Sequence, residues 1–144
     1  MVVVPPLIAR LRIRLGQRDA HYGGDLIDGA RVLGIFGDLA TEIGIRAHGD
    51  EGLLSEYSNL RFSAPLRPGD YIEATARLVR RTRLRCVMDF EAHKVIAARP
   101  DRGATCAELL DPPVLVCSGQ GTLVLPRSAV PVRRSAAVTA GGEQ

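Results

Sequence analysis

Aromatic residues are scarce in this 144-residue sequence, which has no tryptophan, three phenylalanines and three tyrosines. Proteins that bind single-stranded nucleic acid commonly stack bases on aromatic side chains along a basic groove. The net charge is only +3, and residues 127–144, with three arginines and one glutamate, account for +2 of it. The rest of the chain is nearly neutral, so a nucleic-acid partner is disfavoured.

Long apolar stretches are also missing. No run approaches the roughly 18 apolar residues that a membrane-spanning helix requires. The first residues, MVVVPPLIARLRIRL, lack the charged start and the long apolar core of a secretory signal. We therefore expect no membrane partner and a cytoplasmic location.

Motifs for metals and nucleotide cofactors are absent as well. The three cysteines, Cys86, Cys106 and Cys117, show no CxxC spacing, which predicts free thiols and no metal site. No glycine-rich motif for a nucleotide or dinucleotide is present. The sequence therefore predicts no bound cofactor.

Hydrophobic periodicity divides the chain into strands and one long helix. Residues 7–15, LIARLRIRL, alternate apolar and arginine side chains, as in a half-buried strand. From residue 29 to residue 44 the apolar spacing becomes helical, and Asp28 is the expected N-cap. Alternation returns downstream, and strands are expected around 72–78, 84–92 and 114–125, with a hairpin turn at 80–83 and a loop at 99–113.

The expected helix has an unusual surface. Opposite its apolar stripe stand only small residues: Ala30, Gly34, Gly37 and Thr41. Its charged residues gather on one flank: Arg31, Asp38 and Glu42. Glycine costs about 1 kcal/mol in a helix interior, so its use here indicates close approach by other backbone. We expect this helix to be enclosed on most sides.

These elements predict an α+β fold of the hotdog type, an antiparallel sheet wrapped around one long central helix. Residues 1–126 would form the single domain. Residues 127–144 have the small-residue, Pro/Gly composition of a flexible C-terminal tail. Such a domain leaves strand edges that usually pair with another copy, so a homodimer or a higher homo-oligomer is expected.

The stretch DAHYGGDLIDGARVLGIFGDLATEIGIRAHGDEGL resembles the 3-aminobutyryl-CoA ammonia lyases of hotdog fold. The resemblance continues through RFSAPLRPGDYIEA, FEAHKVIAARPD and PPVLVCSGQGTLVLP, and covers about residues 11–126. It implies a lyase that makes or breaks a C–N bond at the β-carbon of an acyl thioester. Coenzyme A or phosphopantetheine would enter only as part of the substrate. The turn RRTRLR and the segment AHGDEG depart from the family pattern.

Two other activities remain open. Related hotdog enzymes of β-amino acid biosynthesis perform a Michael addition of glycine to an enoyl thioester on an acyl carrier protein, and the shared pattern does not separate glycine from ammonia. Acyl-CoA and acyl-carrier-protein thioesterases share the fold and also place a carboxylate near the helix. Hydrolysis needs one carboxylate and a water, so the crowded DAHYGG loop favours amine transfer.

The reaction needs an oxyanion stabiliser beside the thioester carbonyl. Unpaired backbone N–H groups at Gly29 and Ala30, next to Asp28, would lie at the start of the helix, where its dipole favours negative charge. Removing one such donor typically costs about 3 kcal/mol of transition-state stabilisation. The alternative is that these residues only cap and begin the helix.

The reaction also needs a base and an acid. Asp38 and Glu42 are the leading candidates, since two carboxylates on one helix flank can take up a proton and hold an ammonium group. The alternative is a structural network around Arg31. His21 and Tyr22, ahead of the helix, would shuttle a proton or contact the substrate, or be structural. Asp19 and Asp25 are expected to brace turns.

Three further groups complete the expected site. Glu51 and Tyr57, just after the helix, would reach the neighbouring subunit's pocket, with Arg31 as another substrate-binding candidate. A positive turn would meet the phosphates of coenzyme A or an acidic carrier protein: Arg80, Arg81 and Arg83. Such turns are often simply solvated. His48 and His93 are expected on the surface.

Overall fold

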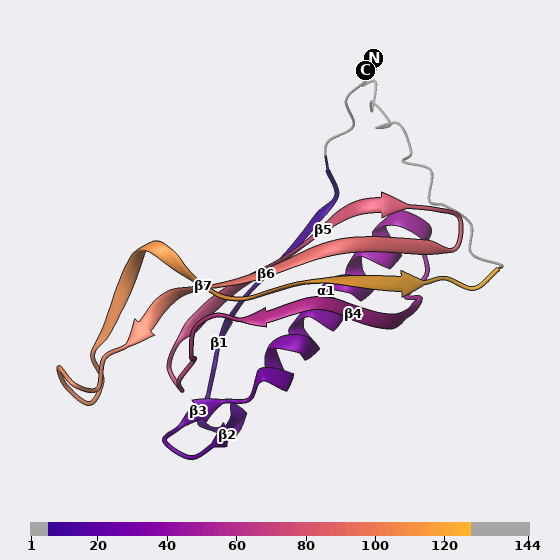
Figure 1. Ribbon diagram of the computed structural model, residues 1–144. Coiled ribbons are helices and arrows are strands. Elements are labelled where there is room, and N and C mark those ends of the chain that lie inside the picture. The colour runs from indigo at the N-terminus through magenta and orange to yellow at the C-terminus, as the bar shows by residue number, and fades with distance from the viewer. Residues whose placement is uncertain (1–5, 128–144) are drawn as a thin grey trace, which may run out of the picture.

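The computed structural model describes residues 6–127. Five strands form one antiparallel sheet in the spatial order β1–β5–β6–β7–β4, and one long helix packs against it (Figure 1). The strands of this sheet are β1 (Ile8–Arg14), β4 (Leu53–Phe62), β5 (Tyr71–Arg81), β6 (Arg85–Ala98) and β7 (Ala107–Val124). A 3-10 turn, η1 (Gln17–Asp19), and a small ribbon, β2 (Ala20–Tyr22) with β3 (Leu26–Ile27), precede the helix α1 (Gly29–His48).

This architecture is the α+β arrangement expected from the periodicity, with one helix against one antiparallel sheet. No helix within residues 6–127 has the length and apolar character to cross a membrane. Of the expected tail at 127–144, residues 128–144 lie outside the described residues, as do residues 1–5 of the expected domain.

Local chemistry sets both ends of α1. The Asp28 carboxylate accepts a hydrogen bond from the Ala30 backbone N–H at 3.0 Å, as expected for an N-cap. At the other end Gly49 adopts a left-handed conformation, with φ 70°, and its N–H donates to the Ile45 carbonyl at 2.8 Å. The helix therefore runs to His48 and not to residue 44, since Gly44 is accommodated inside it.

The core lies between α1 and the sheet. Ile35, Phe36 and Leu39 are fully buried, and the Phe36 ring stacks on Phe90 of β6 with centroids 4.8 Å apart. Ala74 of β5 is also fully buried, and its small side chain lets the helix approach that strand. Full burial of one such large side chain contributes about 1.5–3 kcal/mol, so this stripe fixes the helix on the sheet.

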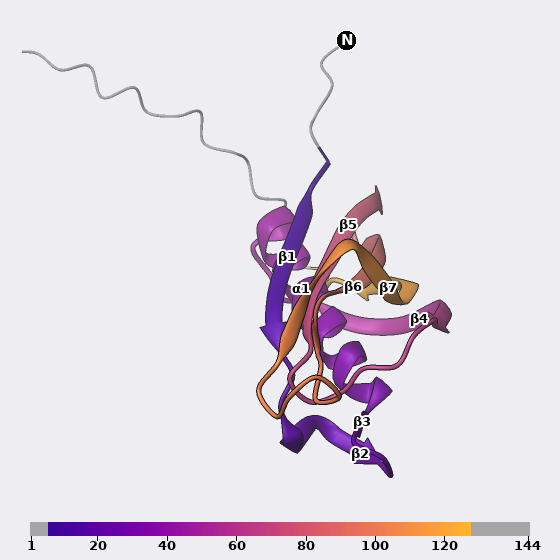
Figure 2. The ribbon, with the colours of Figure 1, turned by 90° about the vertical axis from the view of Figure 1, so that its left-hand side faces the viewer.

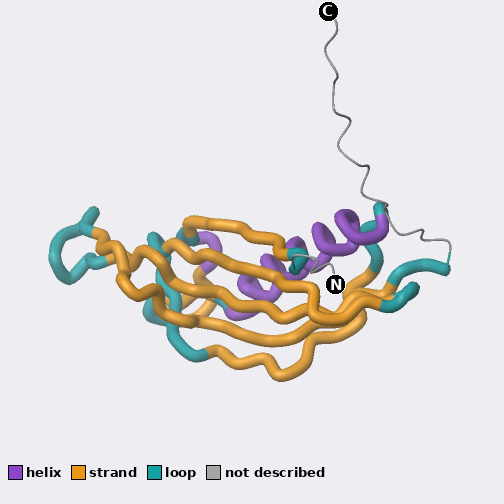
Figure 3. The backbone as a smooth tube through the Cα atoms, turned by 90° about the horizontal axis from the view of Figure 1, so that it is seen from above, coloured by secondary structure: helices purple, strands orange, loops and turns teal. Residues whose placement is uncertain are grey.

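The outer face of α1 is open in the single chain, because the sheet covers only one side of the helix (Figure 3). Gly34, Asp38 and Ile45 are exposed on it, so the expectation of a helix enclosed on most sides is wrong for one chain. Close backbone approach occurs instead at Gly44, where a Cβ atom would lie 2.9 Å from the Asp50 carbonyl oxygen.

Strands β6 and β7 continue beyond the other strands as a two-stranded arm (Figures 1 and 2). Ile96 pairs with Leu109, and Ala98 pairs with Ala107. The loop expected at 99–113 is therefore shorter, and β7 begins at Ala107 and not at residue 114. The ladder shifts register where residues 110–113 include two prolines, which cannot donate to it.

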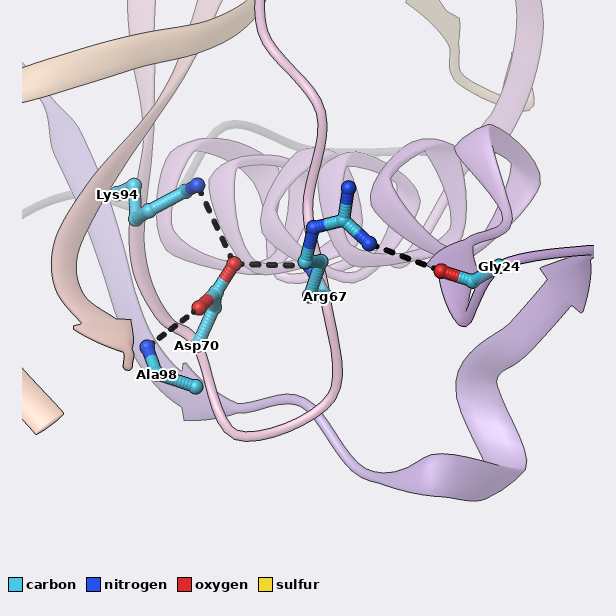
Figure 4. A network of polar contacts seen from close by, with 5 residues as sticks. All are labelled: Gly24, Arg67, Asp70, Lys94 and Ala98. Carbon is cyan, nitrogen blue, oxygen red and sulfur yellow. Dashed lines mark hydrogen bonds and ion pairs between the residues drawn. The ribbon is translucent and has the colours of Figure 1, made fainter. Parts of the chain in front are cut away.

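A buried carboxylate organises the turn ahead of β5 (Figure 4). Asp70 is 2% exposed and accepts hydrogen bonds from the backbone N–H groups of Arg67 and Ala98, both at 2.8 Å. The Lys94 ammonium lies 3.3 Å from the same carboxylate. The Arg67 guanidinium donates to the Gly24 carbonyl at 2.9 Å. The turn, β6 and the loop between β2 and β3 are thereby held together.

Candidate active site

A cavity of about 360 Å³ lies beside the first turn of α1. This volume is at the small end of the roughly 300–1,000 Å³ that ligand pockets occupy. Its lining includes residues of the β2–α1 segment, α1, β4 and β7: Tyr22, Asp28, Gly29, Val32, Phe62 and Cys117. The cavity therefore brings together the expected helix start and one residue of the DAHYGG loop.

The two expected oxyanion donors differ in the structure. The Ala30 N–H is engaged by the Asp28 carboxylate at 3.0 Å, so the expectation that it is free for a substrate is wrong. The Gly29 N–H has no hydrogen-bond partner among residues 6–127, and Gly29 lines the cavity. An unpaired donor at the positive end of the helix dipole thus belongs to a residue that lines the cavity.

The DAHYGG loop is braced by its carboxylates, as expected. Asp19 accepts from the Gly16 N–H at 2.9 Å and pairs with Arg31 at 3.1 Å, while Asp25 accepts from the Gln17 amide at 3.0 Å. Arg31 is therefore tied to the loop and is not at the centre of a network with the helix carboxylates.

The two ring-bearing residues of this loop occupy different positions. Tyr22 lines the cavity and is 55% exposed. His21 is exposed outside the lining, and its ring meets the Tyr22 ring edge to face, with centroids 4.9 Å apart. Only Tyr22 can contact a ligand inside the cavity without a rearrangement.

Asp38 and Tyr57 approach each other at the side of α1 that faces β4. The Tyr57 hydroxyl donates to the Leu33 carbonyl at 2.6 Å, and a Cβ atom on Gly37 would lie 3.7 Å from that hydroxyl. Burial, followed by the negative charge of Asp38, raises the pKa of Tyr57. Asp38 is exposed and has no ion-pair partner within the described part of the chain. A protonated phenol and a free carboxylate therefore lie near each other.

The Glu42 carboxylate is not part of this arrangement of Asp38 and Tyr57. Its carboxylate pairs with Arg46 at 3.2 Å, and Arg46 also donates to the Ile8 carbonyl of β1 at 2.7 Å. Asp38 and Glu42 thus share a helix flank in the sequence pattern, but their contacts lead to opposite edges of the sheet.

Within one chain the helix start and the acidic flank are far apart. Gly29 and Asp38 are nine residues apart, which is about 13 Å along a helix that rises 1.5 Å per residue. Glu42 lies one further turn away. Glu51 is exposed in the segment between α1 and β4. One chain therefore does not bring its own acidic flank to its own Gly29 N–H.

The arginine turn lies at the opposite end of α1 from the cavity (Figure 1). The Arg83 guanidinium donates to the Arg127 carbonyl at 3.2 Å, and both residues line a second hollow of about 510 Å³ with Arg85. No acidic side chain of the described segment pairs with Arg80, Arg81 or Arg83. The turn is cationic, but it cannot serve the cavity of its own chain.

His48 is buried, so the expectation that it lies on the surface is wrong. Its side chain is 3% exposed, and neither ring nitrogen has a hydrogen-bond partner in the described residues. Burial, followed by the positive charge of Arg81, lowers the pKa of His48. Its ring is therefore held neutral at the C-terminal end of α1. His93 is partly exposed and lies 3.9 Å from Glu91.

Several cavity residues carried no signal of their own in the sequence. Phe62 and Cys117 are Cα partners on β4 and β7, and both line the cavity. Alternation along the strands could have placed them on the inner face, but not beside the helix start. Burial raises the pKa of Cys117 to about 11, so its thiol is protonated at neutral pH. The thiol therefore forms part of the cavity wall and does not act as a nucleophile. No group of three or more metal-ligating side chains forms within residues 6–127.

Comparison with known proteins supports this fold. The Thioesterase superfamily model matches residues 26–96. The 3-aminobutyryl-CoA ammonia lyase of Acetoanaerobium sticklandii is 45% identical over 117 residues, which cover 81% of this chain and 93% of that protein. The β-alanyl-CoA:ammonia lyase of Clostridium propionicum superposes with a TM-score of 0.83 at 28% identity, over 90% of this chain and 94% of that one.

More distant structures share the fold alone. A hexameric hotdog thioesterase of Campylobacter jejuni superposes with a TM-score of 0.66 at 15% identity, over 85% of this chain and 86% of that one. The expected hotdog fold and the resemblance to ammonia lyases are thus confirmed. The chain belongs to the 3-aminobutyryl-CoA ammonia lyase family, carbon–nitrogen lyases built on the hotdog fold.

Proposed function

We propose that this enzyme removes ammonia from a short 3-aminoacyl-CoA, with 3-aminobutyryl-CoA as the leading substrate, and adds ammonia to the enoyl thioester in reverse. The α-carbon loses a proton, the bond between the β-carbon and nitrogen breaks, and an α,β-double bond forms. The observation that carries this proposal is the small cavity that meets an unpaired helix N–H at Gly29. Coenzyme A belongs to the substrate, and no separate cofactor is needed.

The Gly29 N–H would hold the thioester oxygen. Charge moves onto that oxygen when the α-proton leaves, and a donor fixed at a helix start stabilises it without reorganising. The Asp28 carboxylate holds Ala30 and so fixes the direction of the first turn. Tyr22 would pack over the bound acyl group, with His21 as a proton relay at the mouth.

The base would come from a second copy of the chain. Strand β4 has a free edge in the single chain, and the outer face of α1 beside it is open. Two copies paired antiparallel through this edge, about a twofold axis perpendicular to the helices, would run their helices antiparallel, so the start of one helix would face a later part of the other. The Asp38 carboxylate of each copy would then serve the cavity of its neighbour.

Asp38 would remove the α-proton, and Tyr57 would assist it. Tyr57 stays protonated at neutral pH because its pKa is raised, and its hydroxyl would turn from the Leu33 carbonyl to hydrogen-bond the leaving amine. Glu42, already paired with Arg46, stays a candidate of lower rank. Glu51 and Arg31 remain candidates for substrate contacts from the neighbouring copy.

The arginine turn would meet the phosphates of coenzyme A in the same dimer. Its three guanidinium groups are exposed and lack acidic partners within residues 6–127. Arginine binds phosphate well because its planar donors match the phosphate oxygens. An acidic carrier protein would use the same charges, and glycine would then replace ammonia as the amine.

The activity test mixes the protein with crotonyl-CoA and either ammonia or glycine. Loss of enoyl absorbance with a β-amino product, and no free thiol, supports the lyase. Free thiol without that product supports a thioesterase. Product only with glycine, and only on a carrier-bound enoyl thioester, supports the Michael addition. Asp38→Asn should lower turnover at least ~100-fold if Asp38 transfers the proton, whereas near-normal turnover removes it from the mechanism.

Gly29 offers a matched pair of variants. Gly29→Pro removes the N–H at the first helical position, where proline is tolerated, whereas Gly29→Ala adds a Cβ atom and keeps the N–H. We expect the proline variant to lose about 10²–10³-fold in turnover relative to the alanine variant. Equal rates for the two variants would exclude the Gly29 N–H as the oxyanion donor.

The shared site has its own test. Randomly mixed Asp38→Asn and Gly29→Pro chains form heterodimers in half of the dimers, and one of their two sites has neither defect if Asp38 acts across the dimer. Mixing two nearly inactive proteins should then restore about a quarter of wild-type turnover. No recovery in verified heterodimers would place both residues in the site of one chain.

A further inference from the structure

Phe62 stands directly over the start of α1. It is the last residue of β4, its Cα partner on β7 is Cys117, and it lines the cavity. A Cβ atom on Gly29 would lie 3.0 Å from its Cε1 atom and 3.2 Å from its Cζ atom. The ring therefore packs next to Gly29, whose N–H has no partner within residues 6–127.

Three other lining residues leave little room for change. Val116 is 2% exposed, Cys117 is fully buried and Val32 is 2% exposed, so each is held by the close packing of the core. Phe62 is 55% exposed and is not packed on all sides. Among these four lining residues it alone can be shortened without opening a hole in the core.

We propose that Phe62 is a specificity-determining residue that restricts the acyl group of the thioester to short chains. This inference rests on the proposed function in taking an acyl-CoA as the ligand and in placing its carbonyl at the Gly29 N–H. The carbonyl next to the Gly29 N–H places the following carbons beside the Phe62 ring. A short chain ends before the ring, and a longer chain meets it.

The test measures the binding of saturated acyl-CoAs by calorimetry. Butyryl-, hexanoyl- and octanoyl-CoA have neither a β-amine nor a double bond, so binding is read without lyase turnover. In the wild-type protein the affinity should not rise beyond butyryl-CoA. In Phe62→Ala each added methylene that becomes buried is worth about fourfold, so octanoyl-CoA should gain at least about tenfold over butyryl-CoA. Phe62→Leu should fall between the two.

Leu109→Ala is the matched control, because Leu109 is 78% exposed on the β6–β7 arm and does not line the cavity. It should keep the wild-type chain-length profile. An unchanged profile in Phe62→Ala, with a native circular dichroism spectrum, overturns the inference, as does an equal shift in the control. If the profile shifts but crotonyl-CoA and ammonia give no product, the proposed function fails and the role of Phe62 stands.

Discussion

Loss of the Asp70 carboxylate should destabilise this fold more than loss of any single surface ion pair. Asp70 is 2% exposed, and its carboxylate serves two backbone N–H groups at 2.8 Å and the Lys94 ammonium at 3.3 Å. Hydrogen bonds to a charged group each contribute about 1.5–3 kcal/mol. Removal of the carboxylate also leaves two buried backbone N–H groups without an acceptor, and each unsatisfied buried donor costs about 1–3 kcal/mol. We therefore expect Asp70→Ala to lower the free energy of unfolding by about 4 kcal/mol.

The size of the loss should depend on what each variant leaves unpaired. Asp70→Asn keeps one acceptor oxygen but turns an NH2 group toward a donor, so we expect about 2 kcal/mol. Lys94→Met leaves both backbone hydrogen bonds intact and removes a cation whose side chain is 16% exposed, so we expect about 1–2 kcal/mol. The expected order of destabilisation is alanine, then asparagine, then methionine.

Urea unfolding followed by far-ultraviolet circular dichroism measures this order. All variants must be compared at one protein concentration, since an oligomer gains stability from association. A loss below about 1 kcal/mol in Asp70→Ala would refute the reasoning. So would a Lys94→Met variant as unstable as the alanine variant, because the cost would then come from the ion pair and not from the N–H groups.

Three further predictions concern other parts of the molecule. Gly44→Ala should destabilise by about 2–3 kcal/mol in the same urea assay, because its Cβ atom would lie 2.9 Å from the Asp50 carbonyl oxygen; unchanged stability would contradict that contact. The pKa of His48 is lowered from 6.5, so the folded protein binds fewer protons than the unfolded chain, and the free energy of unfolding should fall as the pH drops below about 6.5. His48→Leu should lose this pH dependence, and a wild-type profile flat between about pH 7 and 5.5 would contradict it. Iodoacetamide at about pH 8 should alkylate exposed Cys106 well before Cys117, whose pKa is about 11, as peptide mass spectrometry would show; equal rates would mean that the cavity wall opens.

Hydrophobic period was sufficient to predict the helix and the central strands, because α1, β5 and β6 each bury residues at the spacing of their own secondary structure. The ends were harder to predict. The helix passes through Gly44 since the facing chain is close enough to need a glycine, and it stops only at Gly49, whose φ is positive. The length of β7 depends on pairing with β6, which no pattern within residues 99–113 reveals.

The site was predicted only where local chemistry decides it. Asp28 caps the helix because its side chain reaches an N–H two residues away. Partners from distant elements could not be predicted. Glu42 forms an ion pair with Arg46, which also donates a hydrogen bond to a β1 carbonyl, and Arg31 forms an ion pair with Asp19. The charges look equivalent on a helical wheel, yet tertiary contacts separate them.

Lys94 is the only lysine in the chain, and in the folded protein its amine is held against a buried carboxylate. Succinimidyl dyes and amine crosslinkers thus have one side-chain target, and folding shields it. The rate at which such a reagent modifies Lys94 therefore measures how often the turn before β5 opens. Coupling to a support through this side chain would therefore select for molecules that have partly unfolded, whereas coupling through the α-amino group would not.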